Sequence, residues 1–192
     1  MGKGTFTPVV NAFRFYEDGT ESGSTPLAAQ DTDYEYTITG DTKFHLRYRI
    51  DETGAADGAA TDDYRLEMSY NGGFWTGFGT YVAVDTASSL TDGAATTNRA
   101  APNGISDPGS GSFVAGEQEE GNAVVEDHQL TASNFTEHVW ALKLIYADLT
   151  TGGKIIFRVC LNAGSPGMTN NVSPIMSVVK VAAGARRIFV IS

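Results

Sequence analysis

The chain has 192 residues, a formal net charge of −10 and an isoelectric point near 4.6. Such an acidic surface repels nucleic-acid phosphates and anionic lipids, so we expect neither a nucleic-acid partner nor a membrane partner. The one cysteine, Cys160, excludes an intrachain disulfide and a cysteine-based metal site. The length suits a single domain, which we expect to span residues 1–192.

Short runs of alternating apolar and polar residues follow one another along almost the whole chain, and Gly, Asp or Asn residues separate them. A period of two is typical of half-buried β-strands. The expected strands are 11–16, 34–39, 43–51, 63–70, 80–84, 111–116, 128–133, 137–149, 154–161, 175–181 and 186–192. This pattern predicts an all-β fold, an antiparallel β-sandwich or a jelly-roll.

The run "FHLRYRIDETG" (44–54) alternates apolar residues with His45, Arg47 and Arg49. One interpretation is an ordinary strand with its polar face in water, forming a hairpin with residues 63–70 across the acidic loop 51–63. Arg47 or Arg49 would then face Glu67 as a cross-strand ion pair. The other interpretation is an arginine-lined face that binds an acidic partner, such as another copy of this chain. We expect the hairpin.

Residues 85–127 differ from the rest, because Ala, Thr, Ser, Gly, Asp and Asn dominate them. So long a loop is unusual inside a compact domain. It is either a linker between two subdomains or an extended arm that becomes ordered against a neighbouring subunit. We favour the arm, which we expect to be protease-sensitive when the protein is free.

The later strands carry apolar residues on both faces, as central strands or strands covered by another chain do. This pattern predicts a homo-oligomer, a trimer in the first instance. The residues expected at its interface are Val139, Ala141, Ile145, Ile156, Arg158, Ile188 and Val190.

No pattern of catalytic residues stands out. The histidines His45, His128 and His138 lack metal-ligand spacing, and no nucleophile elbow, phosphate-binding loop or metalloprotease motif occurs. We therefore expect no catalytic residue, no metal, no cofactor and no enzyme activity. The run "NGGFWTGFG" leaves two interpretations open: Phe74 and Trp75 cap the core, or they form a glycan platform together with Tyr81.

The order "FRFYEDGT … TPLAA … FHLRYRIDETG … YRLEMSYNGGFW … VWALKL … GKIIFRVCLNAG" resembles that of small all-β structural proteins of tailed bacteriophages. The resemblance spans roughly residues 11–164 and includes no active-site motif. It implies a virion protein that assembles in the host cytoplasm. The expected role is a capsid decoration (cement) protein that binds the major capsid protein or other virion proteins, or else a carbohydrate- or receptor-binding module of a tail or fibre.

Overall fold

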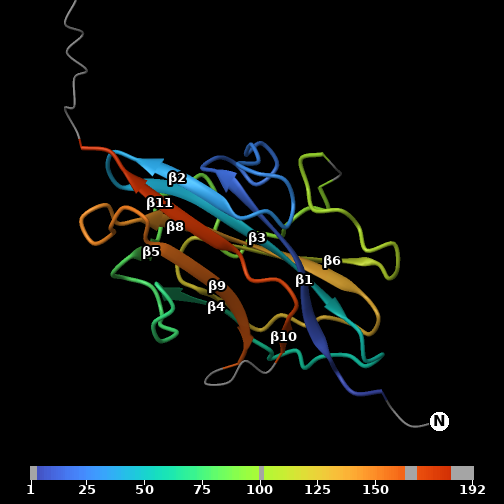
Figure 1. Ribbon diagram of the computed structural model, residues 1–192. Helices are drawn as coiled ribbons and strands as arrows, with labels where there is room; N and C mark the ends of the chain where they lie inside the picture. Colours follow the sequence, from blue (N-terminus) through green and yellow to red (C-terminus); the bar gives the residue numbers. More distant parts are fainter. Residues whose placement is uncertain (1–3, 100–101, 163–167, 183–192) are drawn as a thin grey trace, which may run out of the picture.

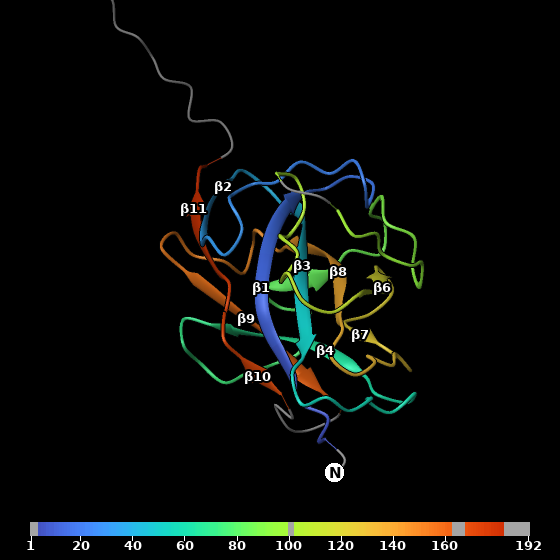
Figure 2. The same ribbon diagram turned by 90° about the vertical axis from the view of Figure 1, so that its right-hand side faces the viewer.

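The computed structural model describes residues 4–99, 102–162 and 168–182, and it shows two β-sheets packed face to face (Figures 1 and 2). Sheet A has the strand order β10-β1-β3-β8-β5, and β6 also pairs with β8. Sheet B has the order β2-β11-β9-β4-β7. The strands are β1 (Pro8–Glu17), β2 (Tyr34–Ile38), β3 (Thr42–Glu52), β4 (Tyr64–Tyr70), β5 (Val82–Val84), β6 (Phe113–Glu119), β7 (Val124–Val125), β8 (Phe135–Leu144), β9 (Lys154–Leu161), β10 (Thr169–Asn170) and β11 (Ile175–Lys180).

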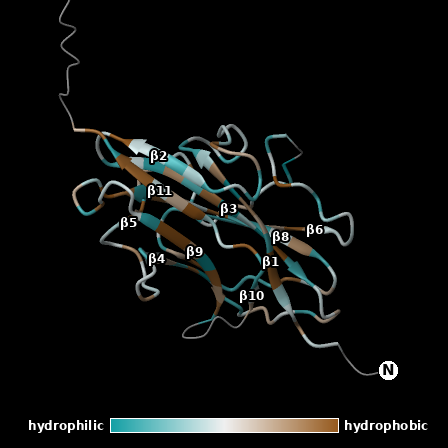
Figure 3. Ribbon diagram, viewed as in Figure 1, coloured by the Kyte–Doolittle hydropathy of each residue, from teal (hydrophilic) through white to brown (hydrophobic). Residues whose placement is uncertain are grey.

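The all-β sandwich predicted from the alternating pattern is confirmed. Most pairings are antiparallel, whereas β1–β10, β2–β11 and β6–β8 are parallel. Of the expected strands, 128–133 is not a strand, and 186–192 lies outside the described residues. Figure 3 shows hydrophobic residues concentrated along strands such as β9 and β11.

The core lies between the two sheets and is rich in aromatic rings. Phe15 of β1 and Phe44 of β3 both contact Phe157 of β9, with ring centroids 6.2 Å apart in each pair. All three side chains are fully buried. The rings meet edge to face, and because burial of one such side chain is worth about 1.5–3 kcal/mol, these contacts help to hold the two sheets together.

The predicted hairpin between residues 43–51 and 63–70 is wrong, because β3 and β4 belong to different sheets. Both edges of β3 are occupied, by β1 on one side and by β8 on the other. β4 instead pairs with β9 and β7 in sheet B and directs Leu66 and Met68 into the core. The acidic loop after β3 therefore carries the chain from one sheet to the other.

The segment 85–127 is not an undocked arm. It contains β6 and β7, and β6 pairs with β8 of the same chain. Within the segment, Thr96 donates its backbone N–H to the carbonyl of Gly116, and Gln118 donates to the carbonyl of Ala94. Apolar residues are too sparse here to reveal this docking by periodicity.

This segment covers the outer face of β8. Leu90 packs against Val139 and Ala141, and all three are buried. The expectation that Val139 and Ala141 meet another subunit is therefore wrong, since the chain's own loop covers them.

The polar face of β3 is also buried, contrary to the prediction that it lies in water. Arg47 is only 1% exposed and donates hydrogen bonds to the carboxylates of Glu21 and Glu137 and to the carbonyl of Thr97. Glu21 lies in the loop after β1, Glu137 lies on β8, and Thr97 lies in the segment 85–127. One guanidinium thus holds two loops onto the outer face of sheet A.

Neighbouring arginines make similar contacts. Arg14 donates to the carbonyl of Gly104 at 2.7 Å, and Arg49 donates to the carbonyl of Ser106 at 2.5 Å. Arg99 donates to the carbonyl of Ser24 at 2.9 Å. The arginines therefore bind carbonyl groups of the loops within this chain, and Arg158, rather than Arg47 or Arg49, pairs with Glu67.

We expect Arg47→Ala to lower the free energy of unfolding by about 3–5 kcal/mol, because it leaves Glu21 and Glu137 buried without their cation. Urea unfolding followed by circular dichroism measures this loss. Thr37→Ala, at an exposed position of β2, is the control and should change stability by less than about 0.5 kcal/mol. A loss below about 1 kcal/mol for Arg47→Ala would contradict the role given to this ion pair.

Candidate interaction surface

The outer face of sheet B is more accessible than that of sheet A. Ile156 of β9 and Ile175 of β11 lie opposite each other in register, and both are half-buried. Arg158 follows on the same face of β9 and is also half-buried. Of the residues expected at an oligomer interface, Ile145, Ile156 and Arg158 are thus partly accessible, whereas Ile188 and Val190 lie outside the described residues.

A hairpin loop, residues 71–79, follows β4 at the edge of this face. Asn71 and Gly72 adopt positive φ angles of 51° and 73°, which turn the chain sharply. Thr76 then pairs back with Met68 through two backbone hydrogen bonds of 2.8 and 3.1 Å. Asn71 in addition accepts a hydrogen bond from the backbone N–H of Lys154. The loop is therefore held on both sides.

This loop presents two aromatic side chains to solvent. Phe74 is 93% exposed and Trp75 is 37% exposed. The interpretation of these residues as core caps is wrong for Phe74 and does not fit Trp75. The loop folds back along β4, and residues of the strands fill the core in its place.

Trp75 rests on a polar cluster. The guanidinium of Arg158 lies 4.2 Å from the centre of the indole ring and donates two hydrogen bonds to Glu67, of 2.7 and 3.0 Å. Cys160 also donates to Glu67. Burial and the adjacent Glu67 raise the pKa of the Cys160 thiol to about 11, so this thiol stays protonated and is a poor nucleophile. Tyr81, the third residue of the expected glycan platform, stacks on Tyr70 with ring centroids 3.9 Å apart.

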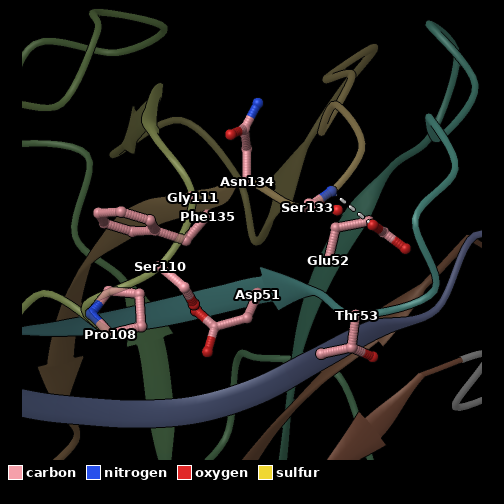
Figure 4. Close-up of a pocket in the computed structure, with 9 residues that line it drawn as sticks. All are labelled: Asp51, Glu52, Thr53, Pro108, Ser110, Gly111, Ser133, Asn134 and Phe135. Carbon is pink, nitrogen blue, oxygen red and sulfur yellow. Dashed lines mark hydrogen bonds between the residues drawn. The ribbon is translucent and has the colours of Figure 1, made fainter.

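A hollow of about 250 Å³ lies at the other end of the sandwich, where β3 ends and β8 begins (Figure 4). Its lining residues are Asp51, Glu52, Thr53, Pro108, Ser110, Gly111, Ser133, Asn134 and Phe135.

The two carboxylates of the hollow are already bonded within the chain. Glu52 accepts hydrogen bonds from the backbone N–H groups of Thr7, Gly54, Ala55 and Ser133, which lower its pKa. Asp51 pairs with Arg49 and accepts a hydrogen bond from Asn11. Neither carboxylate is therefore left to bind a metal ion by itself.

The three histidines, His45, His128 and His138, are all buried. Burial lowers the pKa of His45 and His128, and that of His138 lies well below its ordinary value for the same reason. His138 accepts the backbone N–H of Glu117 and contacts Tyr64 and Trp140. Within the described ranges, no group of three or more His, Cys, Asp or Glu residues could hold a metal ion.

Comparison with protein-family models, with curated proteins and with solved structures found no match to this chain. Among residues 4–99, 102–162 and 168–182, no helix is long and apolar enough to cross a membrane. The assignment of a function therefore depends on the residues and surfaces described above.

We expect Phe74→Ala to leave the free energy of unfolding unchanged within about 0.5 kcal/mol, because the side chain is exposed. Trp75→Ala should cost less than the roughly 3–5 kcal/mol that is usual for a buried tryptophan. Trp140→Ala, at a fully buried position, is the matched control and should show that larger loss. Thermal or urea unfolding of the three variants measures the difference, and a large loss for Phe74→Ala would contradict the exposed position.

A second prediction concerns Glu119, which is buried at the end of β6. Burial, reinforced by Asp92, Glu117 and Glu126, raises its pKa to about 8. The folded protein therefore keeps a proton that the unfolded chain loses near pH 4.5, and the stability linked to this proton falls as the pH rises toward 8.

Glu119→Gln removes this titration. We compare the free energy of unfolding of Glu119→Gln with that of the wild type. The variant's value minus the wild type's should increase by about 1–3 kcal/mol from pH 5 to pH 8, since each pKa unit corresponds to about 1.36 kcal/mol. Glu35→Gln, on the exposed edge of β2, is the control. Urea unfolding at several pH values measures the trend, and a difference that does not change with pH would refute it.

Proposed function

We propose that the chain is a virion structural protein of a tailed bacteriophage that works by binding other protein subunits. The preferred role is that of a capsid decoration protein, a homo-oligomer that binds the major capsid protein and stabilises the head. Its location would be the virion, which assembles in the host cytoplasm. The order of strands and turns that resembles phage structural proteins supports the class of protein.

The observation that carries the proposal is the exposure of Phe74 on a loop fixed by hydrogen bonds at both sides. Large aromatic side chains are frequent anchors of protein interfaces. An anchor that is already held in place loses little conformational entropy on binding, which strengthens association. The exposed Phe74 ring adds nothing to the stability of the folded monomer. Its exposure therefore favours a role in binding another protein surface.

The outer face of sheet A is covered by loops of the same chain, and this is consistent with the proposal. The loops of the chain bury Val139 and Ala141, and the large hydrophobic side chains that stay exposed among the described residues are Phe74, Trp75 and Val181. A decoration protein must bind a shell at defined points, and the rest of its surface must stay hydrated. The net charge of −10 serves the second requirement.

A carbohydrate- or receptor-binding module of a tail or fibre is the second candidate, because Trp75 is partly exposed beside Phe74. Sugars commonly stack on open aromatic faces. In this chain Arg158 covers one face of Trp75, and Tyr70 covers one face of Tyr81. A sugar would therefore have to use the opposite face of Trp75.

Co-sedimentation with purified capsid shells of the encoding phage tests the first candidate. We expect the wild-type protein to bind the shells and Phe74→Ala to bind at least tenfold more weakly, because the anchor is lost. Thr37→Ala should bind like the wild type.

A glycan array on the same samples tests the second candidate. If the protein binds a glycan, loses that binding on Trp75→Ala and does not sediment with shells, the decoration role is wrong and the carbohydrate-binding role is supported.

A further inference from the structure

The dipeptide Asn-Gly occurs twice in the chain, as Asn71–Gly72 in the hairpin loop and as Asn103–Gly104 in the segment 85–127. Asparagine is a thermolabile residue. Its side-chain amide is lost most easily before glycine, because glycine has no Cβ to hinder the approach of its own backbone nitrogen. Since the two sites share the same dipeptide, a difference in reactivity between them comes from the fold.

The peptide group between Asn71 and Gly72 is open to solvent. Both residues are exposed, and a Cβ at Gly72 would meet no atom within 4 Å. Among the described residues, the N–H of Gly72 donates to no protein group, and the side-chain NH2 of Asn71 donates to none either. Solvent base therefore reaches the N–H of Gly72, and ammonia can leave Asn71 directly into water.

The side-chain carbonyl of Asn71 is held by the first residue of β9. Its Oδ1 accepts the backbone N–H of Lys154 at 2.9 Å, and the backbone N–H of Asn71 donates to the carbonyl of Lys154 at 2.8 Å. Attack on Cγ of Asn71 places negative charge on Oδ1. A donor that already points at this oxygen stabilises that charge, as the donors of an oxyanion hole do.

The Asn103–Gly104 peptide is packed tightly instead. The carbonyl of Asn103 accepts a hydrogen bond from the Tyr16 hydroxyl at 2.9 Å, and the carbonyl of Gly104 accepts one from Arg14 at 2.7 Å. Gly104 is buried, and a Cβ there would lie 1.7 Å from the carbonyl oxygen of Arg99. Ring closure requires the nitrogen of Gly104 to turn toward the side chain of Asn103, and these contacts oppose that turn.

We propose that Asn71 is a site of spontaneous deamidation in the folded protein and that the fold protects Asn103. The backbone nitrogen of Gly72 gives its proton to solvent base and bonds to Cγ of Asn71. The bond between Cγ and Nδ2 breaks, and Nδ2 takes up a proton and leaves as ammonia. Water then opens the succinimide ring at either of its two carbonyl groups, which yields aspartate or isoaspartate.

Either product changes the loop that carries Phe74. Both products add a negative charge beside Lys154. Isoaspartate also routes the main chain through the side chain of residue 71, which adds a methylene group at the turn and shifts the register of the hydrogen bonds between Thr76 and Met68. The modification does not depend on the proposed function, whereas its effect on capsid binding does.

Peptide mapping by mass spectrometry tests the site after incubation of the full chain at mildly alkaline pH. We expect the peptide with Asn71 to gain the mass of the amide-to-acid conversion about tenfold faster than the peptide with Asn103, or more. In urea, where the fold is absent, the two peptides should convert at similar rates. Equal rates in the folded protein, faster conversion of Asn103, or no conversion of Asn71 over a period that converts it in urea would overturn the proposal.

Gly72→Ala tests the attacking group, because its methyl group hinders the backbone nitrogen. We expect conversion of Asn71 to slow about tenfold in this variant, whereas Asn103 in urea should convert as in the wild type. Circular dichroism checks that the variant is folded. An unchanged rate at Asn71 would show that the backbone nitrogen is not the attacking group and would overturn the mechanism.

Co-sedimentation with capsid shells separates this proposal from the proposed function. Fresh protein that fails to bind shells, together with a mass gain at Asn71, contradicts the decoration role and supports the modification. Fresh protein that binds shells and shows no mass gain at Asn71 contradicts the modification and leaves the decoration role intact.

Discussion

The ion pair of Arg47 with Glu21 and Glu137 is the contact on which the arrangement of the loops depends. A guanidinium that is 1% exposed must have its charge neutralised by groups of the protein, because no solvent reaches it. Its partners come from the loop after β1 and from β8, and the carbonyl of Thr97 adds the segment 85–127. Burial of this charge is thus coupled to the position of two long loops.

This coupling decides which surfaces of the molecule are available. With the loops in place, Leu90 covers Val139 and Ala141, and the outer face of sheet A presents polar loops instead of apolar strands. A strand that is apolar on both faces therefore does not require a second chain, since an irregular segment of the same chain can cover it. The hairpin loop and the outer face of sheet B stay accessible to solvent.

The sequence was sufficient for the all-β class because alternation is a local signal, and β3, β4, β8 and β9 all show it clearly. Pairing of strands is not local. The hairpin of β3 with β4 was the nearest pairing along the chain, but the partners of β3 are β1 and β8, and β8 begins more than eighty residues after β3 ends. The partners of Arg47 lie 26 and 90 positions away, so no spacing rule indicates them.

The same limit applies to the surface residues. Phe74 and Trp75 are adjacent and of similar character, and only the path of the loop along β4 makes Phe74 fully exposed and places Trp75 on Arg158. Glu119 gave no signal in the sequence because its raised pKa arises from burial and from carboxylates that the fold brings near it. The residues Ile188 and Val190 lie outside the described part of the chain, so their assignment to an interface stays a prediction.

Native-state hydrogen exchange of the free protein tests most directly whether the segment 85–127 is part of the fold. The amides of Gly93, Thr96 and Gln118 donate to the carbonyls of Gln118, Gly116 and Ala94. We expect these amides to exchange slowly, with protection comparable to that of β8 in the same sample. Exchange at the rate of an unstructured chain, while β8 remains protected, would show that the segment 85–127 is not part of the fold.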